Sequence, residues 1–507
     1  MAVTAAGMSA LVAGQYQTTF ADAIDTDAIH ALAENPAIRV LFGTPRALDD
    51  PGGFTVWRTG TPVLVLSGVW ALLAATRVTR GEEDAGRWDL LLGGAVRAVD
   101  LLVRCLVTFA MAALLIATGV GMALILTGTD PAGAIVHAFC VFGTVVVFSC
   151  AGLFAAQLLP SRAAAAGFSG AVLGVCLLLR MLADGVSEVA WTAWVTPFGL
   201  VARAAPYAGN RYEPLLVLVA VGVAFAVAAL AAARNRDLGG ALIVLPATRP
   251  ARTRLLGSMS AFALRRAVMP TMAWSIGIAT YFLLIGALIS SILEFFEGNA
   301  RFAELAASAG FAGLDSATGF AAALFGLLAI PVGLYCATRL AAMGADEKAR
   351  RWTVLHALPV PRCRIAAAEV AVTAAGSFVL LITAAVAMWS GAALTGAPLG
   401  IDAALAGAIN VAPIALLGLG AAMLALGWYP AAVGPVGALP VAGGFLLDVI
   451  ARSIRAPAWL INVSPFAHLS AVPDTGPAWV ASLVLLAIAA ILTAIGLLGY
   501  TCRDLDT

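Results

Sequence analysis

The chain has 507 residues, of which 62% are hydrophobic and 11% are charged, and 29 basic against 28 acidic residues leave a net charge of +1. A soluble domain is about 45–50% apolar and about 25% charged, and disorder requires low hydrophobicity, so both classes are excluded. No basic tail for nucleic acid is present. Many stretches reach the roughly 20 apolar residues that cross a bilayer, which indicates an all-α polytopic membrane protein rather than a β-barrel.

The apolar stretches predict about twelve transmembrane helices in two parallel, pseudo-symmetric six-helix halves. In chain order they cover residues 1–16, 60–79, 101–127, 132–158, 164–183, 214–233, 270–293, 317–338, 365–395, 402–428, 431–450 and 478–500. The first stretch is unusual, because only about fourteen residues precede Gln15-Tyr16-Gln17, fewer than a span needs. Either this helix is short or the natural start lies upstream of Met1.

Loop charges predict the orientation, because cytoplasmic loops carry an excess of Lys and Arg. An even number of spans puts both termini on one side, and that side carries 20 basic and 11 acidic residues, a net charge of +9. The opposite side carries 9 basic and 17 acidic residues, a net charge of −8. We therefore expect a multi-pass protein of a bacterial plasma membrane with both termini in the cytoplasm.

The second half of the chain repeats landmarks of the first. Three pairs match at offsets of 264, 268 and 267 residues: Arg87-Trp88 with Arg351-Trp352, Thr196-Pro197-Phe198 with Ser464-Pro465-Phe466, and Arg236-Asp237-Leu238 with Arg503-Asp504-Leu505. A parallel repeat predicts a pseudo-two-fold axis along the membrane normal. The expected parts are a first half (1–234) with a cytoplasmic segment 80–100 and outer loops 17–59 and 184–213, a cytoplasmic linker (235–269), and a second half (270–507) with a cytoplasmic segment 339–364 and an outer loop 450–477.

The sequence offers no enzyme active site. A phosphate-binding P-loop needs a lysine in a glycine-rich loop, but the only lysine, Lys348, follows Asp346-Glu347 outside any such loop. We therefore expect no ATP hydrolysis by this chain, and we predict no catalytic, metal-binding or cofactor-binding residues. The four histidines are scattered, and none of the seven cysteines has metal-ligand spacing or lies in an expected outer loop, so no disulfide is predicted.

Two cytoplasmic segments, 80–92 and 344–355, share an order of side chains: acidic, then basic, then tryptophan and apolar residues. Acidic residues at a helix start suit the helix dipole, and the apolar face can lie on the membrane or in a groove of a partner. A single copy would more simply be a solvated connecting helix. Two copies at equivalent positions favour a docking element, whose candidate residues are Glu82, Glu83, Arg87, Trp88, Asp346, Glu347, Arg351 and Trp352.

These motifs resemble the permease subunits of bacterial ABC exporters of the type-2 (ABC-2) class, in particular the fused twelve-span permeases that export polyketide or tetronasin-like antibiotics. The resembling runs are Glu82-Glu83-Asp84-Ala85-Gly86-Arg87 followed by Leu90-Leu91-Leu92, Leu358-Pro359-Val360, Thr196-Pro197-Phe198-Gly199, and Arg236-Asp237-Leu238-Gly239. The resemblance implies an efflux permease that is not an enzyme. It also implies a separate ATPase subunit in two copies, which holds ATP and Mg²⁺ and contacts the two segments as coupling helices.

The resemblance further implies an amphiphilic, drug-like or antibiotic substrate that meets apolar side chains of the second, fifth, eighth and eleventh spans. The second copy departs from the family pattern, since Ala349-Arg350 replaces Ala85-Gly86, so its docking is expected to be weaker or asymmetric. The first span also departs, because the family has a full first helix with basic residues before it.

The alternative is a proton-coupled secondary transporter of the major-facilitator kind, which also has twelve spans, and Asp84-Ala85-Gly86-Arg87 imitates its D-x-G-R loop. Three features argue against it. The outer loop 17–59 is long and acidic, the segment after Arg87 continues as an apolar helix, and the second half has no D-x-G-R.

Charged residues inside a membrane are costly and usually paired or functional. Arg180 and Asp184 end the fifth span, and Asp448 and Arg452 end the eleventh with the signs exchanged. Each pair can close within its own helix at i, i+4. The other hypothesis is a crossed latch between the halves, with Arg180 bound to Asp448 and Asp184 bound to Arg452, that holds the outer gate of a transport path.

Overall fold

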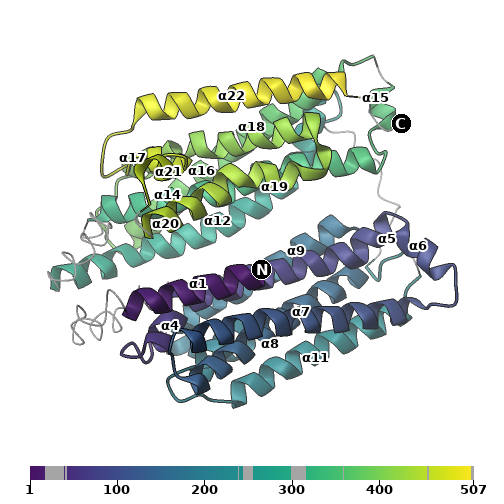
Figure 1. Cartoon of the computed structure of the whole chain (residues 1–507). Helices are drawn as coiled ribbons and strands as arrows, with labels where there is room; N and C mark the ends of the chain where they lie inside the picture. The colour runs from purple at the N-terminus through teal and green to yellow at the C-terminus, as the bar shows by residue number, and fades with distance from the viewer. Residues whose placement is uncertain are drawn as a thin grey trace. The chain divides into compact units, whose positions relative to one another are not determined.

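The described part of the chain is helical. The computed structural model describes residues 1–17, 39, 43–185, 187–237, 239–243, 255–298, 316–357, 359–453 and 456–503, and these ranges contain no strand. The chain divides into two compact units, Met1–Arg249 and Pro250–Thr507, with the boundary inside the predicted linker 235–269 (Figure 1). Across the described residues, eleven helices are long and apolar enough to cross a membrane, and the fold is that of a polytopic helical membrane protein.

Unit 1 is a bundle of six main helices: α1 (Ala2–Gln15), α4 (Pro51–Thr76), α7 (Ala98–Leu126), α8 (Pro131–Leu158), α9 (Arg162–Gly185) and α11 (Glu213–Arg234). The shorter elements are η2 (Arg77–Gly81), α5 (Glu82–Asp84), α6 (Arg87–Leu92), η3 (Ser187–Val195) and α10 (Pro197–Ala204). The first predicted span is α1, whose 14 residues make it shorter than the eleven helices that are long enough to cross a membrane.

Unit 2 has six corresponding segments: α12 (Met259–Gly298), α14 (Ala317–Lys348), α16 (Arg362–Leu394), α17 (Ile401–Asn410) with α18 (Ala412–Trp428), α19 (Val433–Ala438) with α20 (Gly444–Ser453), and α22 (Trp479–Cys502). The shorter elements are α15 (Thr353–His356), η4 (Pro430–Ala432), η5 (Leu439–Gly443), α21 (Ala458–Ile461) and η6 (Pro465–His468). The break between α17 and α18 lies at Val411, just before Pro413, which has no N–H for a continuous helix.

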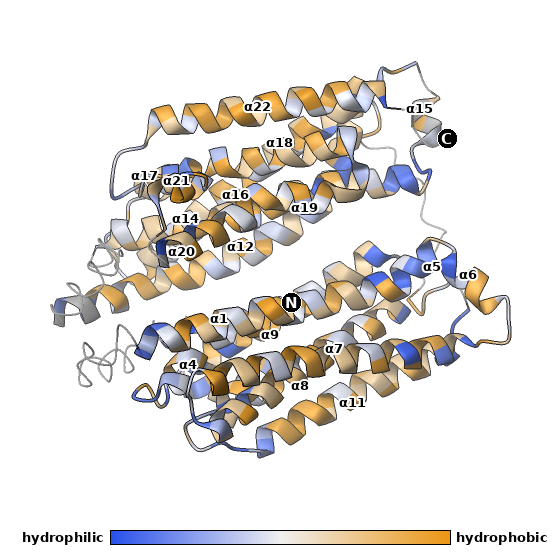
Figure 2. Cartoon of the chain, viewed as in Figure 1, coloured by the Kyte–Doolittle hydropathy of each residue, from blue (hydrophilic) through white to orange (hydrophobic). Residues whose placement is uncertain are grey.

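The two units pack their helices in the same order. In unit 1, α4 contacts α1, α8 and α9, and α8 also contacts α7 and α11. In unit 2, α14 contacts α12, α18 and α19, and α18 also contacts α16 and α22. The fourth segment is the core of each unit: 67% of the most apolar stretch of α8 is buried, and 78% of that of the α17–α18 segment. Figure 2 shows apolar residues along these helices and hydrophilic ones toward their ends.

Two predicted helix starts are wrong, and the eighth span ends at Lys348 instead of residue 338, inside the predicted segment 339–364. The second span begins at Pro51 instead of residue 60, because the Asp50 carboxylate accepts hydrogen bonds from the N–H groups of Gly52 and Gly53 and caps the helix. The seventh span begins at Met259, inside the predicted linker, where the hydroxyl of Ser258 accepts a hydrogen bond from the Ala261 N–H at 3.1 Å. Most of the predicted loop 17–59 lies outside the described residues, as do Leu238, Leu358, Asp504 and Leu505.

Candidate functional site

The predicted coupling segment of unit 1 is a corner at the end of α4. The chain leaves α4 through η2 and α5 and turns at Gly86, whose φ of +69° is a conformation that favours glycine. Glu82 on one side of the corner and Arg87 on the other form a bidentate ion pair, with 2.7 Å between Oε1 and Nη2. The Glu82 carboxylate raises the pKa of the exposed Arg87 guanidinium. The ion pair therefore closes the corner on its solvent side.

The neighbouring carboxylate, Glu83, points into the protein and is buried. It accepts hydrogen bonds from Arg236 Nη1 at 2.8 Å and Nη2 at 2.5 Å, and from the Gly239 N–H at 2.7 Å. The buried Arg80 Nη1 lies 3.4 Å from the same carboxylate. Arg236 lies two residues after the end of α11, so this cluster fastens the end of the second helix of the unit to the end of its last helix.

Unit 2 repeats both links at the equivalent positions. Asp346 accepts a hydrogen bond from Arg351 at 2.8 Å, as Glu82 does from Arg87. Glu347 accepts one from Arg503 at the end of α22, as Glu83 does from Arg236. Two of the three repeat landmarks, Arg87 with Arg351 and Arg236 with Arg503, thus pair with the acidic residues of the corners in both units, contacts that the sequence did not predict.

The two tryptophans of the segments are buried, contrary to the predicted apolar face that lies on a membrane or a partner. Trp88 is 5% exposed and Trp352 is 3% exposed, so neither ring forms a face for a membrane or a partner. Trp352 instead packs inside unit 2, with the Arg266 guanidinium 4.7 Å from its ring centroid. The spacing of apolar residues in an amphipathic segment does not show whether they face inward or outward. Packing against Phe262 and Arg266 of α12 turns Trp352 inward. The exposed side chains include Asp84, Arg87, Asp89, Leu90 and Leu91 in unit 1, and Lys348, Arg350, Arg351 and Thr353 in unit 2.

Unit 2 contains a second buried charge cluster that the sequence analysis missed. Glu369 of α16 is 1% exposed and accepts hydrogen bonds from Arg266 of α12 at 2.5 Å and Arg339 of α14 at 2.8 Å. Arg266 also donates to Asp346 at 2.7 Å, which connects the cluster to the corner of unit 2. The positions 264 residues earlier are Ala2, Ala75 and Cys105, so unit 1 has no counterpart.

The residues of the predicted latch form ion pairs within their own helices. Arg180 Nε lies 2.7 Å from Asp184 Oδ2 in α9, and Arg452 Nε lies 2.8 Å from Asp448 Oδ2 in α20. The first pair is buried, whereas Arg452 is exposed. The structure thus shows the simpler of the two arrangements weighed above. The crossed pairing between the halves stays a prediction.

The fold and its doubled ends define a class: a multi-span helical membrane protein with two equivalent halves, each with a charged corner after its second helix. Comparison with known proteins narrows this class of protein further. Residues 256–501 match the family described as "Multidrug efflux system permease Rv1217c, C-terminal domain". The chain is also 29% identical, over 495 residues, to the "Multidrug efflux system permease protein Rv1217c" of Mycobacterium tuberculosis (strain ATCC 25618 / H37Rv), with 94% of this chain and 86% of that protein covered. These similarities support a role as the permease of a transport system.

Proposed function

We propose that the chain is the membrane-spanning permease subunit of an ABC-2 type exporter for amphiphilic drug-like or antibiotic molecules. The observation that carries the proposal is the similarity of nearly the whole chain to a multidrug efflux permease. The only lysine, Lys348, lies in no P-loop, so an ATP-driven cycle would need a separate ATPase subunit, in two copies, that holds ATP and Mg²⁺. The cytoplasmic corners are the surfaces on which that ATPase would act.

The internal links suggest how a push on a corner would reach the membrane helices. In unit 1, Glu83 and Arg236 bind the corner to the end of α11, so a displaced corner moves α4 and α11 together. In unit 2, Glu347 and Arg503 bind the corner to the end of α22 in the same way. Charge-assisted hydrogen bonds are short and strong, and buried pairs resist separation. The bundle would therefore tilt as a body instead of bending at the corner.

The two corners offer different chemistry to a partner. In unit 1 the exposed side chains include two leucines, and Leu90 is 83% exposed. In unit 2 they include Lys348, Arg350 and Arg351. Two identical ATPase copies would thus meet an apolar, acidic surface on one half and a basic surface on the other, which supports asymmetric docking.

Co-purification tests the proposal. The tagged chain is co-expressed with the ATPase encoded by a neighbouring reading frame, and the stoichiometry and nucleotide hydrolysis of the purified complex are measured. Leu90→Glu should abolish co-purification, since it places a charge on an exposed apolar docking side chain. Leu126→Glu is the matched control, because Leu126 is 80% exposed at the far end of α7. Equal loss of ATPase from both variants contradicts docking at the corner.

A secondary transporter of the major-facilitator kind is the alternative. Reconstituted chain without an ATPase should show no uptake when a pH gradient is imposed across the liposome membrane. Proton-driven transport by the chain alone would overturn the proposal.

A further inference from the structure

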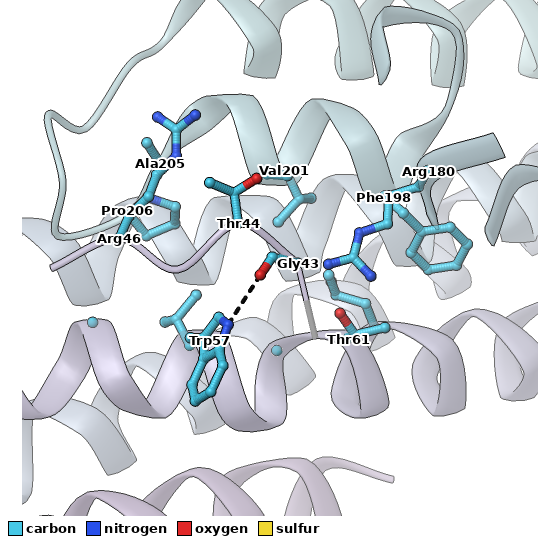
Figure 3. A pocket seen from close by; sticks show the side chains of 15 residues that line it. Gly43, Thr44, Arg46, Trp57, Thr61, Arg180, Phe198, Val201, Ala205 and Pro206 are labelled. Carbon is cyan, nitrogen blue, oxygen red and sulfur yellow. Dashed lines mark hydrogen bonds between the residues drawn. The ribbon is translucent and has the colours of Figure 1, made fainter. Parts of the chain in front are cut away.

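A small cavity lies in unit 1, at the opposite end of α4 from the cytoplasmic corner (Figure 3). Its volume is about 70 Å³, and its walls include Gly43, Thr44, Trp57, Thr61, Phe198 and Val201. The 25 residues from Trp57 to Glu82 at 1.5 Å per residue put the cavity roughly 38 Å from the corner, about the thickness of a bilayer. It therefore belongs to the other membrane face, which the loop charges predict to be the outer one.

Arg180 enters this cavity from α9 with unused hydrogen-bonding capacity. The residue is 4% exposed, and Figure 3 shows its guanidinium between Gly43 and Thr61. Its Nε is paired with Asp184, and its Nη2 packs against Gly43 so closely that a Cβ there would lie 2.0 Å away. Its Nη1 is buried and has no hydrogen-bond partner among the described residues. A guanidinium has five N–H donors, and leaving one buried without an acceptor is unfavourable.

The surroundings favour an anion as the missing acceptor. Arg39, Arg46 and Arg203 lie close enough to Asp184 to attract its carboxylate, so several guanidinium groups gather around one acid. Burial, together with the nearby Arg211, lowers the pKa of Arg46, as expected where like charges approach each other. Neutral water would satisfy the Arg180 N–H but would leave this excess of positive charge uncompensated.

We propose that the cavity binds the anionic head group, carboxylate or phosphate, of an amphiphilic molecule, with Arg180 Nη1 as the donor. The volume exceeds the roughly 30 Å³ of one water but is far below the roughly 300–1,000 Å³ of a drug-sized pocket, so it admits a head group only. Phe198 and Val201, both buried, offer an apolar wall for the start of the attached chain. The inference goes beyond the proposed transport function, because it requires neither an ATPase nor turnover.

Binding is tested on the full chain in nanodiscs of phosphatidylcholine, which carries no net charge. Laurate is the anionic probe and dodecanol its neutral counterpart, and calorimetry reports binding. Arg180→Gln combined with Asp184→Asn removes both charges of the pair and should weaken laurate binding by at least about tenfold, with dodecanol unaffected. Asp448→Asn combined with Arg452→Gln, the equivalent pair of unit 2, is the matched control and should bind laurate as the unchanged protein does.

Further measurements identify the source of the anion and test whether a variant has lost binding through misfolding. Competition by added phosphatidylglycerol assigns a lipid head group, and competition by inorganic phosphate assigns a soluble anion; either supports the site. Asp184→Asn alone keeps Arg180 and removes a competing carboxylate, so it should bind laurate at least as tightly as the unchanged protein. Equal affinity for laurate and dodecanol, or equal loss in both double variants, overturns the proposal. Neither result would affect the transport proposal, whose test is ATPase co-purification.

Discussion

The buried link between Glu83 and Arg236 should contribute strongly to the stability of unit 1. Glu83→Gln keeps the shape of the side chain but removes its charge, and it leaves Arg80 and Arg236, 2% and 6% exposed at their side chains, without a carboxylate between them. Removing one partner of a buried ion pair costs about 3–5 kcal/mol, because the remaining charge stays desolvated. We expect a loss of that size in the free energy of unfolding.

The measurement is unfolding of the purified chain by SDS in mixed micelles, followed by circular dichroism. Glu82→Gln is the matched control, since its partner Arg87 is 58% exposed at the side chain and an exposed pair contributes only about 0–1 kcal/mol. The combination of Glu83→Gln and Arg236→Gln should cost less than the sum of the two single changes, with a coupling of about 0.5–3 kcal/mol. Equal effects of Glu83→Gln and Glu82→Gln would refute the assignment of Glu83 as a buried anchor.

Four further predictions follow from other contacts. Glu369→Gln should destabilise unit 2 by about 3–5 kcal/mol in the same unfolding assay, because two buried arginines lose their shared carboxylate. Gly43 has a φ of +96° and packs against Arg180, so Gly43→Ala should lower the free energy of unfolding by about 1–3 kcal/mol. Gly167 lies in a helix with open space around it, so Gly167→Ala should leave that free energy unchanged or raise it, and equal effects of the two changes would contradict the packing of Gly43. Burial raises the pKa of Tyr207 to about 12, so ultraviolet titration should show its phenol still protonated at pH 11. The free energy of unfolding should fall as the pH rises from about 10, the ordinary pKa of tyrosine, to about 12, because the unfolded chain releases this proton first. If the α9 pair acts within its helix, Arg180→Asp with Asp184→Arg should restore the proposed export activity where either single variant has lost it. If Arg180→Asp with Asp448→Arg restores it instead, the crossed latch is correct.

The sequence predicts the class of fold and most helix positions, because long apolar runs have few alternatives in a chain this poor in charge. The third and fourth spans, predicted at 101–127 and 132–158, are observed as Ala98–Leu126 and Pro131–Leu158. Helix starts are missed where polar capping residues extend the helix beyond its apolar stretch, as Asp50 and Ser258 do. Hydropathy has no information about such caps.

The sequence predicts where the corner residues lie along the chain, but not which distant residues they contact. The acidic residues of both corners were recognised, yet Glu83 and Arg236 are 153 residues apart in sequence, and no local pattern indicates that they meet. The Glu369 cluster was missed for the same reason, since its three charges come from three helices. The repeat was the one available signal: two residues that recur at matched offsets in both halves are candidates for a shared contact.

The differences between the halves bear on how a common force would act on them. Both corners are fastened to the last helix of their unit, but only in unit 2 does an arginine of the first helix, Arg266, join the corner at Asp346 to Glu369 of the third helix. In unit 1 the corner is joined instead to the start of α9, where Asp84 accepts a hydrogen bond from the Arg162 N–H at 2.9 Å. Equal forces on the two corners would therefore be transmitted to different helices in the two units. If two identical copies of the proposed ATPase drive transport, they would still move the two halves unequally, because the asymmetry lies in this chain.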